Sequence, residues 1–112
     1  MSYIYLIGEL DSLNTYKIGV TKHKNIEKRI SELQTGNAKE LYVRTYFKSK
    51  YPYKLEKMLH RNYHKSHIIN EWFELTEDEV KNFIQTCENF ESTLDMLENT
   101  TLALNKKSDL FS

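Results

Sequence analysis

Several side chains in the first 60 residues have the chemistry to hydrolyse a phosphodiester bond. This reaction needs an activated water and cations that stabilise the negative charge developing at phosphorus. Tyr5 can relay a proton from the water, and cationic neighbours would lower its pKa from about 10. Arg29 can hold two phosphate oxygens and stays charged at any working pH. Lys17 can supply the neighbouring charge or, if desolvated enough to lose its proton, act as the base.

Glu56 is the predicted metal ligand. A single carboxylate suits a Mg²⁺ or Mn²⁺ ion that keeps several waters and also contacts a phosphate oxygen. Such an ion would stabilise the leaving oxyanion. His60 lies one helical turn after Glu56 and can pass a proton or orient a water. These residue types could together support metal-dependent phosphodiester hydrolysis, with Mg²⁺ or Mn²⁺ as cofactor.

Two predicted strands and a predicted helix carry Tyr5, Lys17 and Arg29. The patterns of residues 3–8 and 15–20 predict two strands, joined in a hairpin by a polar turn. Lys17 shares a strand face with Gly19, where the absence of a side chain allows backbone or substrate to approach. A helix is predicted from Asn25 to about Gly36, with Arg29 at the rim of its apolar stripe.

Residues 40–48 alternate as a third strand. Leu41, Val43 and Phe47 fall on one face. The other face is basic and aromatic, which makes Arg44 a candidate substrate contact; its members are Tyr42, Arg44, Tyr46 and Lys48.

The second half of the chain predicts two more helices. Pro52 opens a helix that carries Glu56 and His60 along one edge of its core stripe. Residues 71–75 are short and apolar, as in an extended segment or an edge strand. A capping box at residues 76–79 then starts a long helix with an apolar seam, which can pack on the domain or pair with a second copy.

The composition describes one soluble globular domain. A chain of 112 residues, 39% of them hydrophobic, can bury one core but is too short for two. No apolar run approaches the roughly 18 residues that span a bilayer, and no secretory leader opens the sequence. We therefore expect an intracellular, non-secreted protein without membrane contact. The single cysteine, Cys87, excludes an intramolecular disulfide and a cysteine-based zinc site.

The net charge of zero conceals two halves of opposite sign. Residues 1–65 carry 13 Lys and Arg against 6 Asp and Glu, whereas residues 66–112 carry 3 against 10. All eight tyrosines lie in the basic half. A basic, tyrosine-rich body predicts binding to a polyanion. The alternative is a mixed-charge surface whose two halves attract each other.

The order of these residues resembles the GIY-YIG nuclease superfamily, above all its compact single-domain branch, which is common in viruses and phages. Residues 3–5, YIY, stand at the first motif with its glycine lost. Residues 17–19, KIG, stand at the second with lysine for tyrosine. Arg29 matches the family arginine and Glu56 its metal-binding glutamate. The resemblance covers residues 3–75.

This resemblance implies an endonuclease that cleaves DNA and leaves 5′-phosphate and 3′-hydroxyl ends. Its expected fold is α/β: a small three-stranded, mainly antiparallel sheet flanked by helices, with an added C-terminal helix. The expected substrate contacts are Tyr16, the displaced motif tyrosine, with Gly19, Arg44 and Asn70, the nearest candidate for a late family asparagine.

The expected organisation is a nuclease core over residues 1–75, a helix packed on it over 76–100 and a polar tail over 101–112. Through that helix the chain could form a homodimer. With no recognition domain attached, the protein should grip phosphates with limited sequence specificity.

Each assignment has a simpler alternative. Tyr5 could be an ordinary strand aromatic, Arg29 could pair with Glu32 three residues later, and Glu56 could pair with a lysine of the adjacent turn. A helix histidine such as His60 more often packs than reacts.

Further alternatives concern the remaining groups and the whole chain. His60, His64 and His67 have a spacing that could suit zinc, although no further ligand completes the site. Trp72 and Phe73 are more typical of a core than of a base-stacking surface. For the whole protein, the alternatives are a catalytically degenerate nucleic-acid-binding or protein-interaction module of the same fold, and an interaction protein that uses its acidic helix.

Overall fold

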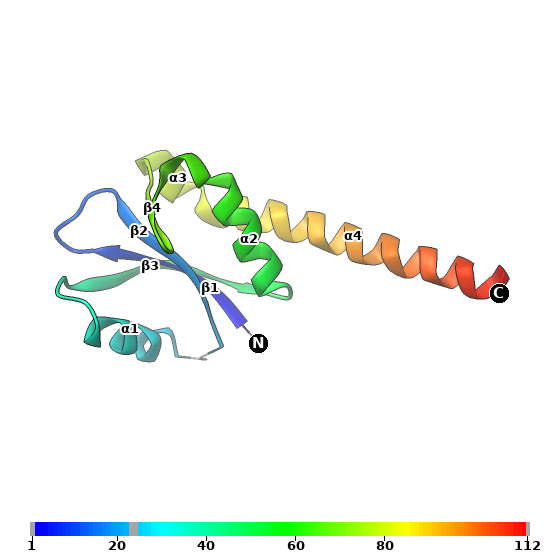
Figure 1. Ribbon diagram of the computed structural model, residues 1–112, viewed down its shortest axis with the longest axis horizontal. Coiled ribbons are helices and arrows are strands. Elements are labelled where there is room, and N and C mark those ends of the chain that lie inside the picture. The colour runs from blue at the N-terminus through cyan, green and yellow to red at the C-terminus, as the bar shows by residue number, and fades with distance from the viewer. Residues whose placement is uncertain (1, 23–24, 112) are drawn as a thin grey trace.

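The protein is built on a five-stranded sheet in the order β3-β1-β2-β5-β4, with every neighbouring pair antiparallel. The computed structural model describes residues 2–22 and 25–111, with side chains as far as residue 101. Figure 1 shows α1 on one side of the sheet, α2 on the other and α4 projecting beyond it. In chain order the elements are β1 (Ser2–Glu9), β2 (Thr15–Thr21), α1 (Ile26–Thr35), β3 (Leu41–Ser49), α2 (Pro52–Asn62), the 3₁₀ turn η1 (His64–Ser66), β4 (His67–Ile69), β5 (Trp72–Glu74), α3 (Glu77–Lys81) and α4 (Phe83–Phe111).

The predicted α/β class and the β1–β2 hairpin are confirmed, but the predicted three-stranded sheet is wrong. β4 and β5 form a second hairpin, whose turn contains Asn70 at a positive φ of 51°. Asparagine tolerates this left-handed conformation better than most residues. β5 then pairs with β2, so the segment at residues 71–75 lies inside the sheet rather than at its edge. Strands of 3 residues are too short to give an alternating pattern.

Two hydrophobic layers hold the sheet, and β1 contributes to both. Ile4 and Leu6 point to the sheet face that α2, α3 and α4 cover, here called the α2 face. Tyr5 and Ile7 point to the opposite face, beneath Ile30 and Leu33 of α1, here called the α1 face. β1, which lies between β3 and β2 in the sheet, is therefore buried on both faces.

A bulge in β3 changes which side chains share a face. Leu6 lies opposite Thr45 and Ile7 lies opposite Val43, so Arg44 is the extra residue and has no direct partner on β1. The bulge reverses the alternation that the sequence predicts for the second half of β3.

The predicted faces of β3 are therefore wrong in part. Leu41 packs on the α1 face, whereas Phe47 packs on the α2 face. Tyr46 lies directly opposite Tyr5, and Lys48 lies on the same face two residues further along β3. The bulge thus brings an aromatic side chain beside Tyr5 and a basic side chain beside Tyr3.

The C-terminal helical region is two helices rather than one. The predicted capping box at Thr76 is present, but α3 ends at Lys81, and Asn82 is its C-cap before α4 begins. The first part of α4 packs into the core through Phe83 and Cys87, which are fully buried. Most of the predicted polar tail over 101–112 falls where side chains lie outside the described residues.

Polar contacts tie α4 to the segment between β3 and α2. The Ser49 hydroxyl donates to Glu91 (2.7 Å), and the Tyr51 hydroxyl donates to Asp95 (2.7 Å). The Asp95 contact raises the pKa of Tyr51 to about 12. Among the described helices, none is long and apolar enough to cross a bilayer.

Candidate active site

Tyr5 lies at the centre of β1, fully buried, with Gly19 of β2 directly opposite. A methyl group at Gly19 would overlap the ring and hydroxyl of Tyr5. The ring therefore lies across the bare backbone of Gly19. The sequence predicted a close approach at this glycine, and the group that approaches is Tyr5 itself.

Arg29 extends from α1 towards the Tyr5 hydroxyl, close enough to act on its pKa. Its Nη1 also donates to Glu32 Oε2 at 3.3 Å, so the contact that offered a simpler explanation of Arg29 is present as well. The Nε atom is buried without a hydrogen-bond partner. An unpaired buried donor costs about 1–3 kcal/mol. Arg29 therefore has donor capacity to spare for an anionic ligand.

Burial raises the pKa of Tyr5 above its ordinary 10.0. The nearby Arg29 guanidinium opposes this rise in pKa, while the negative charges of Glu71 and Glu56 add to it. The sequence-based expectation that cationic neighbours lower this pKa is wrong, because only Arg29 acts in that direction and burial outweighs it.

Lys17 lies on the same sheet face and pairs with an acidic residue that the sequence reasoning did not select. Its Nζ is 3.6 Å from Glu71 Oε2 and 5.7 Å from the centre of the Trp72 ring. The register of β2 and β5, which sets Lys17 opposite Trp72, produces both contacts. A local sequence pattern carries no information on this register, so nothing marked Glu71 in advance.

His60 fastens α2 to the second-motif strand. The Ile18 amide donates to the Glu71 carbonyl (3.0 Å), and the Ile18 carbonyl lies 3.1 Å from His60 Nε2. The imidazole also meets Phe73 edge-on, with ring centres 5.0 Å apart. His60 thus packs and hydrogen-bonds in this structure, and these contacts hold the neighbouring turn of α2 against β2.

Glu56, one turn before His60, is half-buried. Within the part of the chain that the structure describes, its carboxylate makes no hydrogen bond or ion pair. Burial raises the pKa of Glu56, the Glu71 charge raises it further, and His60 lowers it. Two neighbouring carboxylates with incompletely balanced charge are an environment that favours a bound cation.

The zinc alternative finds no support. His60, His64 and His67 line a cavity of about 250 Å³ with Phe73. However, no three His, Cys, Asp or Glu side chains among the described residues are grouped closely enough to hold a metal ion. Phe73 is buried in the core, as expected.

Two predicted substrate contacts, Tyr16 and Arg44, lie on the sheet face opposite Tyr5, and a third, Asn70, lies in a turn. Tyr16 is buried on the α2 face, and Arg44 lines a cavity there with Val80 of α3. Asn70 lies in the β4–β5 turn beside Glu71, where its carbonyl is 2.6 Å from His67 Nε2. The α1 face of the sheet therefore groups Tyr5, Lys17, Gly19 and Arg29, and Glu71 joins them through its ion pair with Lys17. Glu56 and His60 lie on α2, from which the Glu56 charge acts on Tyr5.

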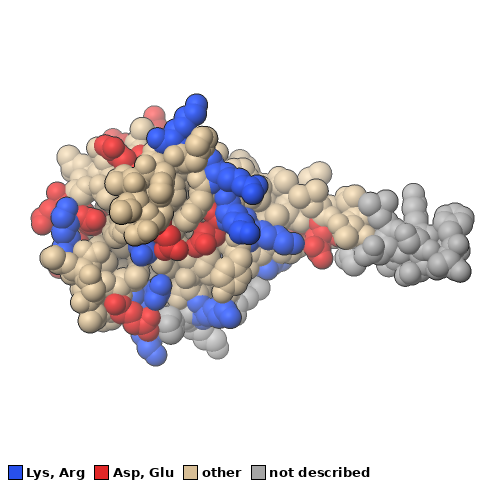
Figure 2. All heavy atoms as spheres, in the orientation of Figure 1, with Lys and Arg blue, Asp and Glu red and all other residues tan. Residues whose placement is uncertain are grey.

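Basic side chains flank this group along α2. Lys54, Lys57 and Arg61 are all exposed. Figure 2 shows Lys and Arg side chains running along this helix, next to acidic side chains near the middle of the same face. This charge distribution suits a polyanion that contacts α2 and meets carboxylates at its centre.

Residues 2–88 match the family model described as the T5orf172 domain. The match extends from β1 into α4 and includes every residue of the candidate site. No curated protein and no solved structure shows significant similarity to the chain.

Proposed function

The chain belongs to the T5orf172 domain family, and we propose that it is a metal-dependent endonuclease that hydrolyses DNA phosphodiester bonds through a GIY-YIG-type site. The observation that carries the proposal is the convergence of Tyr5, Arg29 and Glu56. These residues come from separate elements, yet Arg29 and the Glu56 charge both act on the pKa of the Tyr5 hydroxyl. Phosphodiester hydrolysis needs such a set of proton-transfer, anion-binding and metal-binding groups.

Arg29 binds the scissile phosphate in this mechanism. Its side chain is 31% exposed and carries five donors, so it can hold phosphate oxygens while it remains close to Tyr5. Phosphate binding and the position of the Tyr5 hydroxyl are thereby coupled. Lys17, held as a cation beside Glu71, adds positive charge to this face of the sheet, which favours its charge-supplying role over the role of base.

Tyr5 accepts the proton of the attacking water once it has lost its own proton and is a phenolate. Besides burial, the influences that raise its pKa are mainly the charges of Glu71 and Glu56, so neutralising these carboxylates favours the phenolate. Burial keeps bulk water from the hydroxyl, so the reacting water must enter with the substrate. His60 keeps the Glu56 turn in position through its bond to Ile18.

The residues around Glu56 fit a divalent cation. Glu56 is a half-buried carboxylate with a raised pKa and a second carboxylate nearby, and one or two carboxylates are the usual protein ligands of Mg²⁺. Glu56 would hold Mg²⁺ or Mn²⁺, and when bound, the ion supplies Lewis-acid stabilisation of the leaving oxygen.

A nicking assay tests the proposal. The wild type should nick supercoiled plasmid DNA in Mg²⁺ or Mn²⁺ and not in EDTA. Glu56→Ala and Arg29→Ala should each abolish nicking without changing the circular dichroism spectrum. Glu74→Ala removes an exposed carboxylate from β5 and is the matched control, which should nick normally. Nicking by Glu56→Ala at the wild-type rate would overturn the metal assignment.

The second candidate is a catalytically degenerate nucleic-acid-binding module of the same fold. The burial of Tyr5 and its raised pKa favour it, because both weaken a proton-accepting role. It predicts salt-sensitive DNA binding with no cleavage in any metal.

A further inference from the structure

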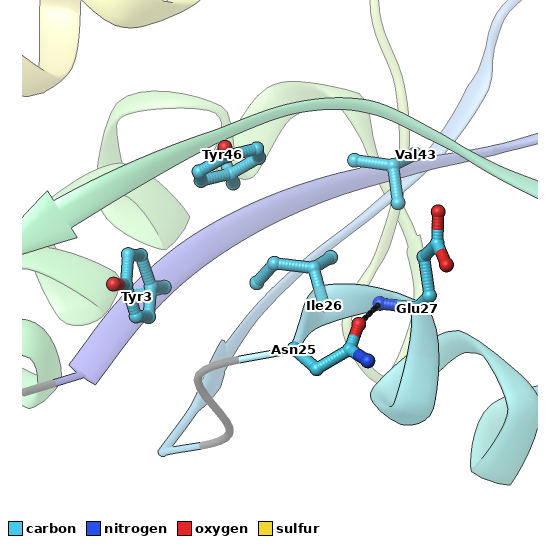
Figure 3. Close-up of a pocket in the computed structure, with 6 residues that line it drawn as sticks. All are labelled: Tyr3, Asn25, Ile26, Glu27, Val43 and Tyr46. Carbon is cyan, nitrogen blue, oxygen red and sulfur yellow. Dashed lines mark hydrogen bonds between the residues drawn. The ribbon is translucent and has the colours of Figure 1, made fainter.

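A separate cleft opens on the α1 face beside the candidate site. It has a volume of about 400 Å³ and lies between β1, β3 and the start of α1. Figure 3 shows Tyr3 and Tyr46 on one side, Ile26 in the middle and the Glu27 carboxylate near Val43 on the other side. This volume falls within the range of small-molecule pockets.

The cleft adjoins Tyr5 through the strand register. Tyr46 is the cross-strand partner of Tyr5, and Tyr3 precedes Tyr5 by two residues on β1. Two residues along a strand span about 6.6 Å. A nucleotide next to a phosphate bound by Arg29 can therefore reach the two rings.

The side chains of the cleft favour a nucleobase over a phosphate. The Tyr3 and Tyr46 rings meet edge-to-face, with centres 5.9 Å apart, and Tyr46 is 54% exposed, so one of its faces can stack on a base. The Asn25 side-chain oxygen already accepts a hydrogen bond from the backbone amide of Glu27. The Glu27 carboxylate repels phosphate but accepts hydrogen bonds from the amino groups of bases.

A basic side chain borders the aromatic pair. Lys48 lies directly opposite Tyr3 and is exposed. Its ammonium can contact the sugar-phosphate backbone while the base lies in the cleft. An aromatic platform with a flanking cation is the arrangement that binds single-stranded nucleic acid.

We propose that this cleft receives an unpaired nucleobase adjacent to the scissile phosphate, so that the substrate is single-stranded or locally unpaired DNA. A base inside a duplex has both faces stacked and cannot enter such a cleft without leaving the helix. The position next to the scissile phosphate rests on the proposed nuclease function, whereas the base-binding role of the cleft does not.

The test is binding to fluorescent oligonucleotides in EDTA, which separates binding from cleavage. Tyr46→Ala should weaken single-stranded DNA binding about 5- to 150-fold, the effect of removing one stacking ring, and leave duplex binding unchanged. Tyr46→Phe should bind like the wild type. Tyr53→Ala is the matched control, because Tyr53 is 57% exposed and lies on α2, outside the cleft. Equal losses for both DNA forms, or no loss for either, would refute the cleft.

A cleavage assay on the same oligonucleotides separates the two proposals. If Tyr46→Ala cleaves both single-stranded and duplex DNA at the wild-type rates, the nuclease proposal stands and the base-binding role of the cleft is refuted. If single strands bind in a Tyr46-dependent way but are not cleaved in Mg²⁺ or Mn²⁺, the base-binding role of the cleft stands and the nuclease proposal is refuted. A 2-aminopurine base that is quenched by the wild type and not by Tyr46→Ala would support stacking directly.

Discussion

The ring of Tyr5 lies across Gly19, and this contact joins the two strands that carry the first and second sequence motifs. Any side chain at position 19 would occupy the space of the Tyr5 hydroxyl. The glycine is therefore required by packing as well as by any approach of substrate. Because Arg29 acts on the same hydroxyl, a change at Gly19 should also affect the proposed phosphate-binding group.

Gly19→Ala should accordingly reduce plasmid nicking on the order of 100-fold, since a displacement of about 1 Å in a catalytic group has effects of that size. DNA affinity should fall much less. Two glycines provide controls. Gly36→Ala meets nothing within 4 Å and should behave as wild type. Gly8→Ala overlaps Tyr42 on the α2 face and should lower the melting temperature without a selective loss of nicking.

Lys17→Met should reduce cleavage far more than DNA binding. The substitution keeps the apolar stem near Trp72 but removes the cation that faces Glu71. Lys54→Met is the matched control, because Lys54 is exposed on α2 and should act as a simple phosphate contact that lowers binding and cleavage together. Filter-binding and single-turnover cleavage measure the two effects. Equal losses for Lys17→Met would reduce Lys17 to a phosphate contact as well.

The longer elements were predictable because their patterns are regular. Alternation in β1 and β2 and the cap at Asn25 locate the strands and the helix that carry Tyr5, Lys17 and Arg29. These signals are local, and each element follows from its own residues.

What escaped prediction depends on contacts between distant segments. The bulge at Arg44 leaves the local pattern of β3 looking regular, yet it turns Arg44 away from Tyr5 and Tyr46 toward it. Glu71 joins the site only because β5 pairs with β2, and a strand of 3 residues gives no sign of its register. The net pKa of Tyr5 likewise depends on burial that only the assembled fold reveals.

The predicted homodimer would form through the exposed apolar residues of α4. Met96 and Leu97 are 67% and 59% exposed, whereas Phe83 and Cys87 earlier in the helix are buried. We expect a mass that rises with concentration in light scattering. Leu97→Lys should leave a monomer with unchanged nicking, and Glu98→Lys, which changes charge beside the seam, should still associate. A wild type that stays monomeric at every concentration would contradict the prediction.

Glu71→Gln should change the pH dependence of cleavage on its acid side. The ionised form of Glu56 is required to hold the cation, and the Glu71 charge helps to raise the pKa of Glu56. Removal of that charge makes ionisation of Glu56 easier, so the acid limb of the kcat/KM profile should move to lower pH. The same change should lower the pKa of Tyr5 and move the alkaline titration of its NMR signal to lower pH. If neither the acid limb of the kcat/KM profile nor the NMR titration of Tyr5 moves, Glu71 does not act on the site.

Glu56→Gln should stabilise the folded protein at neutral pH while it abolishes cleavage. The pKa of Glu56 is higher in the folded than in the unfolded chain, because burial and Glu71 disfavour its charge. Protonation therefore favours folding. The resulting stability is fully present below the ordinary pKa of 4.5 and is lost as the pH rises through the pKa of Glu56 in the folded protein.

The Glu56→Gln variant cannot ionise at this position, so its melting temperature at pH 7 should exceed that of the wild type by on the order of 2–5 °C. The difference should vanish at acidic pH, where the wild-type carboxyl is neutral too. Glu74→Gln, at an exposed position, should melt like the wild type throughout. A Glu56→Gln variant that is less stable than the wild type at pH 7 would mean that the carboxylate supports the fold. Glu56 would then have a structural role, and its stability cost would no longer argue for a functional one.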